Sequence, residues 1–134
     1  MSDNRSMNDF YQQIAKELID VRPELEKIRE SDVQIILLSS DKKAKSKGGA
    51  LYGQCEKIQD KYKWAIPADF TITLFEPNLE GFTDEQLSIL IFHELLHVGV
   101  DLDENGDWKY TIIPHDLEDF KVIVDEYGTD WAEV

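Results

Sequence analysis

Apolar residues near the N-terminus recur at helical spacing and predict the first element. Between about Asn8 and Glu30, six apolar positions follow one another at intervals of three or four residues, as one face of an α-helix requires. They are Phe10, Ile14, Leu18, Val21, Leu25 and Ile28. Pro23 interrupts this pattern, and proline lacks the amide donor that a helix interior needs. We therefore expect a kinked helix or two helical pieces.

Three short apolar stretches predict β-strands. The stretch from Val33 to Leu38 is nearly continuous and rich in strand formers, as a buried strand is. A second candidate runs from about Ala50 to Ile58. From Phe70 to Phe75, large apolar residues alternate with threonine, which predicts a strand with one buried face.

A second helix has clear boundary signals. Thr83, followed three residues later by Gln86, matches a capping box. From Gln86 to Val98 almost every residue is apolar, which predicts a helix buried on most sides. Besides Gln86 itself, the exceptions are Ser88, His93, Glu94 and His97. Gly99 is well placed to end this helix.

The remaining pattern predicts a hairpin and a last helix. Asn105-Gly106 is a strong tight-turn signal before a strand candidate from Trp108 to Ile113. From about Asp116 to Tyr127, apolar residues again recur at helical spacing. The order of helix, strands, buried helix and final helix predicts an α+β fold. We treat residues 1–134 as one domain in which residues 1–7 are a flexible N-terminus.

Composition is that of a globular protein with 42% hydrophobic and 31% charged residues. No apolar run approaches the roughly 20 residues that cross a bilayer, and the N-terminus lacks the apolar region of a secretory signal. We therefore expect a soluble, cytoplasmic protein with no membrane contact. Cys55 is the single cysteine, which excludes an intramolecular disulfide and a four-cysteine zinc ribbon. We expect it to be a small buried hydrophobe.

The net charge of −14 argues against direct nucleic-acid binding, because a field of that sign repels phosphate backbones. The local exception is the stretch from Asp41 to Gly49, which holds four lysines. We interpret it as a solvated, mobile loop. The alternative is a contact patch for an acidic partner or a flap near a cleft.

The segment His93-Glu94-Leu95-Leu96-His97 carries the candidate chemistry. Two histidines four residues apart on a helix point in nearly the same direction, so both imidazoles can reach one metal ion. Glu94 lies about 100° round the axis, where it can hold a water and act as a general base. Zinc lowers the pKa of a bound water to about 7, so the pattern predicts a zinc hydrolase that cleaves peptide bonds. Two buried histidines and a surface glutamate are the alternative.

A catalytic zinc normally has three protein ligands and one open position. His115 is the remaining histidine, and a hairpin between residues 99 and 114 would return the chain to the active-site helix. We therefore predict His93, His97 and His115 as metal ligands and Glu94 as the catalytic base. Glu118 and Asp116 compete with His115 for the third position.

The stretch from Asp101 to Asp107 matches the opening of a calcium-binding loop, including the glycine at its sixth position. The twelfth position, where such loops carry a bidentate glutamate, is Ile112. We therefore interpret this stretch as an acidic hairpin turn.

Two segments together resemble the putative phage metallopeptidase family of zincin-like domains. They are Phe92-His93-Glu94-Leu95-Leu96-His97 and Pro114-His115-Asp116-Leu117-Glu118-Asp119-Phe120, and the stretches 52–55 and 68–70 and Trp131 add to the likeness. SprT-like proteases are more distant, since their His-to-Phe spacing is one residue shorter.

The resemblance implies a zincin-like fold: a small mixed sheet, a buried active-site helix, and flanking N- and C-terminal helices. It also implies that His93, His97 and His115 are the ligands, that Glu94 is the base, and that the substrate is a protein or peptide. Zincin folds place an edge strand beside the cleft, where an extended peptide can pair with it, and we expect Phe70–Phe75 to be that strand. The alternative function is a non-catalytic zinc module whose acidic surface captures a basic protein.

Overall fold

A computed structural model describes residues 3–46, 49–114 and 126–127 of the chain. Its N-terminal helical region is divided as the sequence predicts: α1 (Asp9–Val21), a 3-10 turn η1 (Pro23–Leu25) and α2 (Glu26–Glu30). Pro23 stands at the first position of η1, where a proline needs no donor. In this described part, no helix combines the length and apolar character required to cross a bilayer.

The main sheet has four strands in the order β1-β2-β6-β5. They are β1 (Arg5–Met7), β2 (Ile35–Ser40), β6 (Phe70–Phe75) and β5 (Gly53–Lys57). β6 runs parallel to β2 and antiparallel to β5, and β1 is antiparallel to β2, so the sheet is mixed. The sequence-based prediction of β6 as an edge strand was wrong. β6 lies between β2 and β5, so it is a central strand, and most of its side chains are buried.

The N-terminus and α1 together close one margin of the sheet. Residues 5–7, which we expected to be part of a flexible N-terminus, form β1 and pair with Leu38–Ser40. Where β1 ends, the side-chain amide of Gln12 continues the pairing. Its oxygen accepts from Leu37 N at 3.0 Å and its nitrogen donates to Ile35 O at 3.0 Å. One side chain thus supplies both hydrogen bonds that a neighbouring strand would give to β2.

The helix α3 (Asp84–Leu95) begins at the predicted capping box. The Thr83 hydroxyl accepts from Gln86 N at 3.1 Å, and the Gln86 side chain accepts from Thr83 N at 2.8 Å. The helix ends at Leu95, earlier than predicted, and Gly99 lies inside the following strand. The apolar run Val98–Val100 continues as buried strand rather than helix, which periodicity cannot distinguish in a short apolar stretch.

The strands β7 (Val98–Leu102) and β8 (Trp108–Ile112) form the predicted antiparallel hairpin. Gly106 has a φ of +81° at its tip, a backbone conformation that glycine adopts without strain. The Asp103 carboxylate accepts from Asn105 N at 2.8 Å and from Asp107 N at 3.0 Å. The stretch that resembles a calcium loop is therefore an acidic hairpin turn, as predicted.

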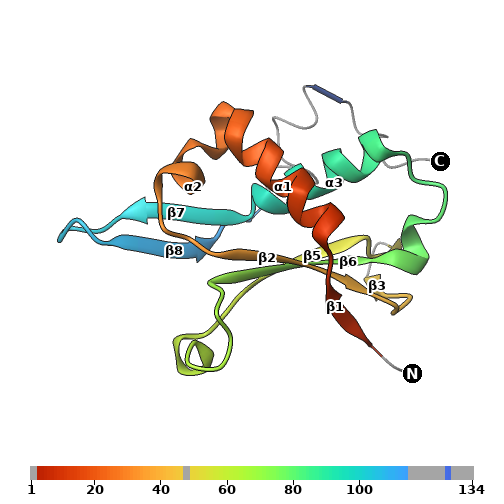
Figure 1. The fold of residues 1–134 in the computed structure, drawn as a ribbon, viewed down its shortest axis with the longest axis horizontal. Coiled ribbons are helices and arrows are strands. Elements are labelled where there is room, and N and C mark those ends of the chain that lie inside the picture. Colours follow the sequence, from red (N-terminus) through yellow and green to blue (C-terminus); the bar gives the residue numbers. More distant parts are fainter. Residues whose placement is uncertain (1–2, 47–48, 115–125, 128–134) are drawn as a thin grey trace.

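The helices α1 and α3 lie on the same face of the sheet, and the hairpin extends to one side of it (Figure 1). The core between these layers is formed by fully buried apolar side chains from the sheet and α3. They are Leu37, Phe70, Ile72, Leu74, Ile91 and Leu95. This arrangement is the predicted α+β fold. The predicted last helix, residues 116–127, lies outside the described residues except for Glu126 and Tyr127.

The lysine-rich stretch contains a small ladder of its own. Two short strands, β3 (Lys45–Ser46) and β4 (Gly49–Ala50), pair antiparallel, while residues 47–48 between them lie outside the described residues. β4 occupies the start of the strand predicted from Ala50 to Ile58, and β5 occupies its second half.

Candidate metal centre

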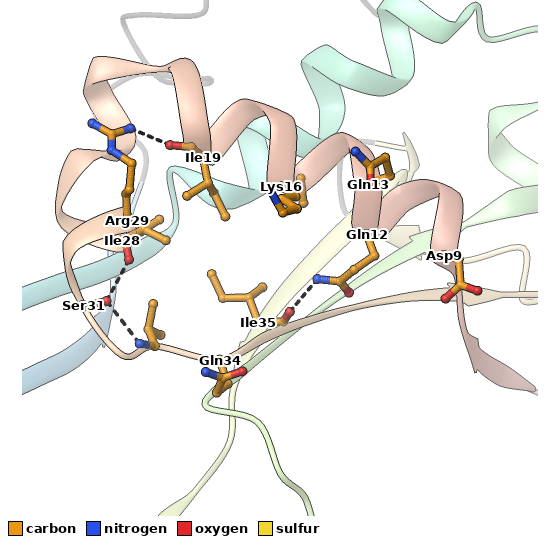
Figure 2. Close-up of a pocket in the computed structure, with 12 residues that line it drawn as sticks. Asp9, Gln12, Gln13, Lys16, Ile19, Ile28, Arg29, Ser31, Gln34 and Ile35 are labelled. Atoms are coloured by element: carbon orange, nitrogen blue, oxygen red, sulfur yellow. Dashed lines mark hydrogen bonds between the residues drawn. The ribbon is translucent and has the colours of Figure 1, made fainter.

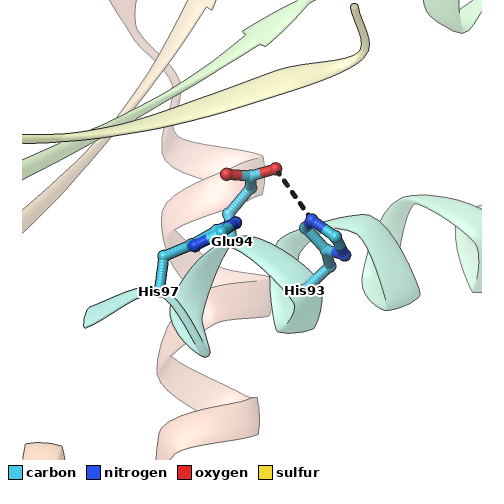
Figure 3. Close-up of side chains that lie close together, drawn as sticks. All are labelled: His93, Glu94 and His97. Carbon is cyan, nitrogen blue, oxygen red and sulfur yellow. Dashed lines mark ion pairs between the residues drawn. The ribbon is translucent and has the colours of Figure 1, made fainter. Parts of the chain in front are cut away.

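Three side chains at the C-terminal end of α3 lie close enough to share one metal ion. His93 and Glu94 belong to the last turn of α3, and His97 follows in the turn before β7. One ligand atom from each of them lies within 4.8 Å of the others. His93 Nε2 is 3.8 Å from Glu94 Oε2, and the two imidazole rings are 5.2 Å apart and nearly perpendicular (Figure 3). The predicted helical motif therefore brings its three polar residues together.

Glu94 is an acidic residue whose side chain is buried among the apolar side chains of α3. It is 4% exposed and is flanked by the fully buried Leu95 and by Phe92. The edge strand β5 passes directly over it, since a Cβ added to Gly53 would lie 3.2 Å from Glu94 Oε2. A buried carboxylate costs several kcal/mol unless it is paired or binds a cation. A carboxylate held among these apolar side chains beside the His93 ring fits a site whose function needs it.

The ring of His97 is oriented by the end of the hairpin. Its Nδ1 lies 2.7 Å from the carbonyl oxygen of Ile113. A carbonyl oxygen only accepts hydrogen bonds, so the Nδ1 atom is the donor and Nε2 carries the lone pair of the neutral ring. Metal-binding histidines characteristically donate their second nitrogen to a carbonyl or carboxylate in this way. The donor set and this tautomer fit a transition metal such as zinc.

The third predicted ligand, His115, lies outside the described residues, as do its competitors Asp116 and Glu118. The described residues on either side of them contact other parts of the chain, and those before them reach the metal centre. On one side Ile113 is bonded to His97. On the other, the Glu126 carboxylate accepts from Arg22, whose guanidinium lies 4.2 Å from the centre of the Phe92 ring. Phe92 directly precedes His93 in the sequence.

Cys55 lies on β5, two residues from Gly53 and therefore on the same face of the strand. Burial raises the pKa of its thiol to about 12, and the negative charges of Glu94 and Glu56 contribute to the rise. The thiol is therefore neutral over the physiological range and is neither a nucleophile nor a ready metal ligand. The side chain is only half-buried, so it packs against the core as a small hydrophobe but is less deeply buried than predicted.

A separate hollow of about 540 Å³ lies between α1 and the start of β2. Several polar groups on its walls are already used within the protein (Figure 2). Gln12 bonds the backbone of β2, Arg29 donates to Ile19 O, and the Ser31 hydroxyl donates to Ile28 O. None of the three residues of the metal centre lines it. We therefore assign the candidate chemistry to the end of α3.

Two features of the site were not predicted from the sequence. The close approach of Gly53 to Glu94 has a weak signal, since a glycine within a strand often marks close contact with another backbone. The Ile113 carbonyl has no sequence signal, because every residue carries a carbonyl group.

The comparison with known families supports a metallopeptidase. A family described as "Putative phage metallopeptidase" matches residues 4–134. No curated protein and no solved structure gives a significant match to the chain.

Proposed function

Since the chain belongs to the putative phage metallopeptidase family, we propose that it is a zinc-dependent peptidase that cleaves an intracellular protein. The observation that carries this proposal is the cluster of two imidazoles and a buried carboxylate at the end of α3. The family supports a metal-dependent peptidase in general. The choice of zinc, the role of each residue and the substrate class are our proposals.

Two of the proposed ligands are His93 and His97. Their rings lie next to each other, and the tautomer of His97 fits metal binding through Nε2. His115 is the proposed third ligand, which leaves one position for water and substrate. Ile113, two residues before His115 in the sequence, lies beside His97, and this contact supports the choice.

Glu94 is the proposed general base. Zinc, when bound, would polarise the scissile carbonyl and lower the pKa of a water. Glu94 would accept the proton from the attacking water and deliver it to the leaving amine. The low exposure of Glu94, 4%, favours this role, because a carboxylate shielded from bulk water keeps the proton it receives within the site.

We propose that the substrate pairs with β5, and not with Phe70–Phe75 as the sequence suggested. It is an edge of the main sheet in the described part of the chain, and its first residue, Gly53, lies beside Glu94. An extended peptide that pairs with an edge strand gains main-chain hydrogen bonds irrespective of its sequence. Such pairing along β5 would bring a peptide bond toward Glu94.

The decisive experiment compares metal content and peptide hydrolysis in wild type and two variants. Purified wild type should contain one zinc per chain and cleave an unfolded protein such as casein. His97→Ala should lose both properties, and Glu94→Gln should keep zinc but lose hydrolysis. A Glu94→Gln protein as active as wild type would exclude the mechanism. Zinc retained in the absence of hydrolysis, with casein and varied peptide pools, would instead favour the non-catalytic binding module.

A further inference from the structure

The pair of His97 and Ile113 extends the β7–β8 ladder by one step and forms its last rung. In this pair a side-chain nitrogen, and not a main-chain amide, donates to the Ile113 carbonyl. A hydrogen-bonded pair of an antiparallel ladder exchanges two N–H···O bonds. Ile113 N donates to His97 O at 2.7 Å, but His97 N donates to Glu94 O at the end of the helix, 3.1 Å away. The Ile113 carbonyl would therefore lack its ladder partner, and the imidazole Nδ1 supplies the missing hydrogen bond at 2.7 Å.

Gly99 controls how closely β8 approaches β7 at this point. It pairs with Thr111, one ladder repeat from the His97–Ile113 rung. A Cβ on Gly99 would overlap the Thr111 hydroxyl and lie 2.9 Å from the Thr111 carbonyl oxygen and 3.0 Å from Ile113 Cγ1. A side chain at Gly99 would therefore push β8 outward, and the Ile113 carbonyl would move with it.

We propose that Gly99 and the main-chain carbonyl of Ile113 position the metal-binding ring of His97, an inference that rests on the proposed metallopeptidase function. The carbonyl holds the proton on Nδ1 and directs the Nε2 lone pair to the metal. Gly99 is a positioning residue, because it acts only through the separation of the two strands. The hairpin thus provides the hydrogen-bond acceptor that other metal sites take from a carboxylate side chain.

Two proteins test the proposal through the tautomer of His97, which a change in overall stability does not alter. In metal-free wild type, long-range ¹H–¹⁵N correlation spectra at a pH where the ring is neutral should show the His97 proton on Nδ1. In metal-free Gly99→Ala, the same spectra should show a mixture of tautomers or a shift to Nε2. Zinc affinity, measured by competition with a chromophoric chelator, should fall roughly 10–100-fold in Gly99→Ala.

Gly106→Ala is the matched control in the same hairpin. Gly106 has a positive φ at the tip and has nothing within 4 Å of an added Cβ, so alanine there strains the turn without moving the His97–Ile113 rung. It should destabilise the hairpin yet keep the wild-type tautomer and zinc affinity. If Gly106→Ala lowered zinc affinity as much as Gly99→Ala, the positioning role would be excluded.

The measurement on wild type keeps the test valid even if Gly99→Ala does not fold. A wild-type His97 with its proton on Nε2 in the metal-free protein would overturn the proposal. Because that spectrum requires neither metal nor substrate, a failure to hydrolyse peptides would contradict the proposed function and leave the tautomer result intact.

Discussion

Gly53 on β5 lies against the Glu94 side chain of α3. A Cβ on Gly53 would be 3.2 Å from Glu94 Oε2, 3.3 Å from Glu94 Cγ and 3.0 Å from Leu74 Cδ2. These distances are shorter than ordinary van der Waals contact, so a side chain here would require its neighbours to shift. The absence of a Cβ at Gly53 therefore lets the edge strand lie directly over the carboxylate of the site.

Gly53→Ala should displace Glu94 and lower peptidase activity at least tenfold. Overpacking of a close contact also costs about 1–3 kcal/mol of unfolding free energy, which urea denaturation measures. Gln54→Ala, at an exposed position on the opposite face of the same strand, should leave activity and stability near wild type. Equal activity in the two variants would mean that the Gly53 contact does not position Glu94.

Thr83→Ala should destabilise the protein by about 1 kcal/mol, because it removes one half of the capping box of α3. Thr83→Ser keeps a hydroxyl acceptor for Gln86 N and should recover most of the loss. Thermal unfolding of the three proteins gives the comparison. Thr83 lies at the opposite end of α3 from His93, so zinc affinity should not change in either variant.

Cys55 should make the protein less stable as the pH rises above 9. Burial raises the pKa of its thiol from 9.0 to about 12, so at these pH values the unfolded chain loses a proton that the folded chain keeps. This contribution is intact below pH 9 and declines by about 1 kcal/mol between pH 9 and pH 10. Urea denaturation of wild type and Cys55→Ala at both pH values should show the smaller decline in the variant. Equal declines would contradict the assigned burial of the thiol.

Asp103→Ala should weaken the tip of the β7–β8 hairpin, because its carboxylate accepts from Asn105 N and Asp107 N. The loss of these bonds should lower the unfolding free energy by about 1 kcal/mol, and Asp103→Asn, which keeps an acceptor oxygen, should lose less. Calcium at millimolar concentration should not raise the melting temperature of wild type. A rise of several degrees that Asp103→Ala abolishes would identify the turn as a calcium site instead.

The elements with local signals could be predicted from the sequence. The capping box at Thr83, the break at Pro23 and the tight turn at Gly106 all lie where their residues predict. Each of these signals depends on backbone chemistry within a few residues, so no distant contact is needed to determine it. The spacing of His93 and His97 is another such local signal, and the two rings lie next to each other as expected.

The errors arose where distant contacts decide the structure. We expected Phe70–Phe75 to be an edge strand. β6 is instead a central strand, because β2 and β5 pair with it from both sides. The run after His97 was apolar enough for a helix, but pairing with β8 makes Val98–Leu102 a strand. Gly99 is consequently required for strand contact rather than for ending a helix.

The side-chain amide of Gln12 affects which strand edges of this protein can pair with another polypeptide. It occupies the hydrogen-bonding groups of β2 that β1 leaves uncovered, so an intruding chain finds no continuous backbone to join on that side. Gln12 thus opposes self-association of the protein through pairing of β2 with β2 of another copy. At the opposite edge of the main sheet, β5 passes over Glu94 and could pair with an extended chain. Gln12 would in this way favour pairing of another chain with β5 over self-association through β2.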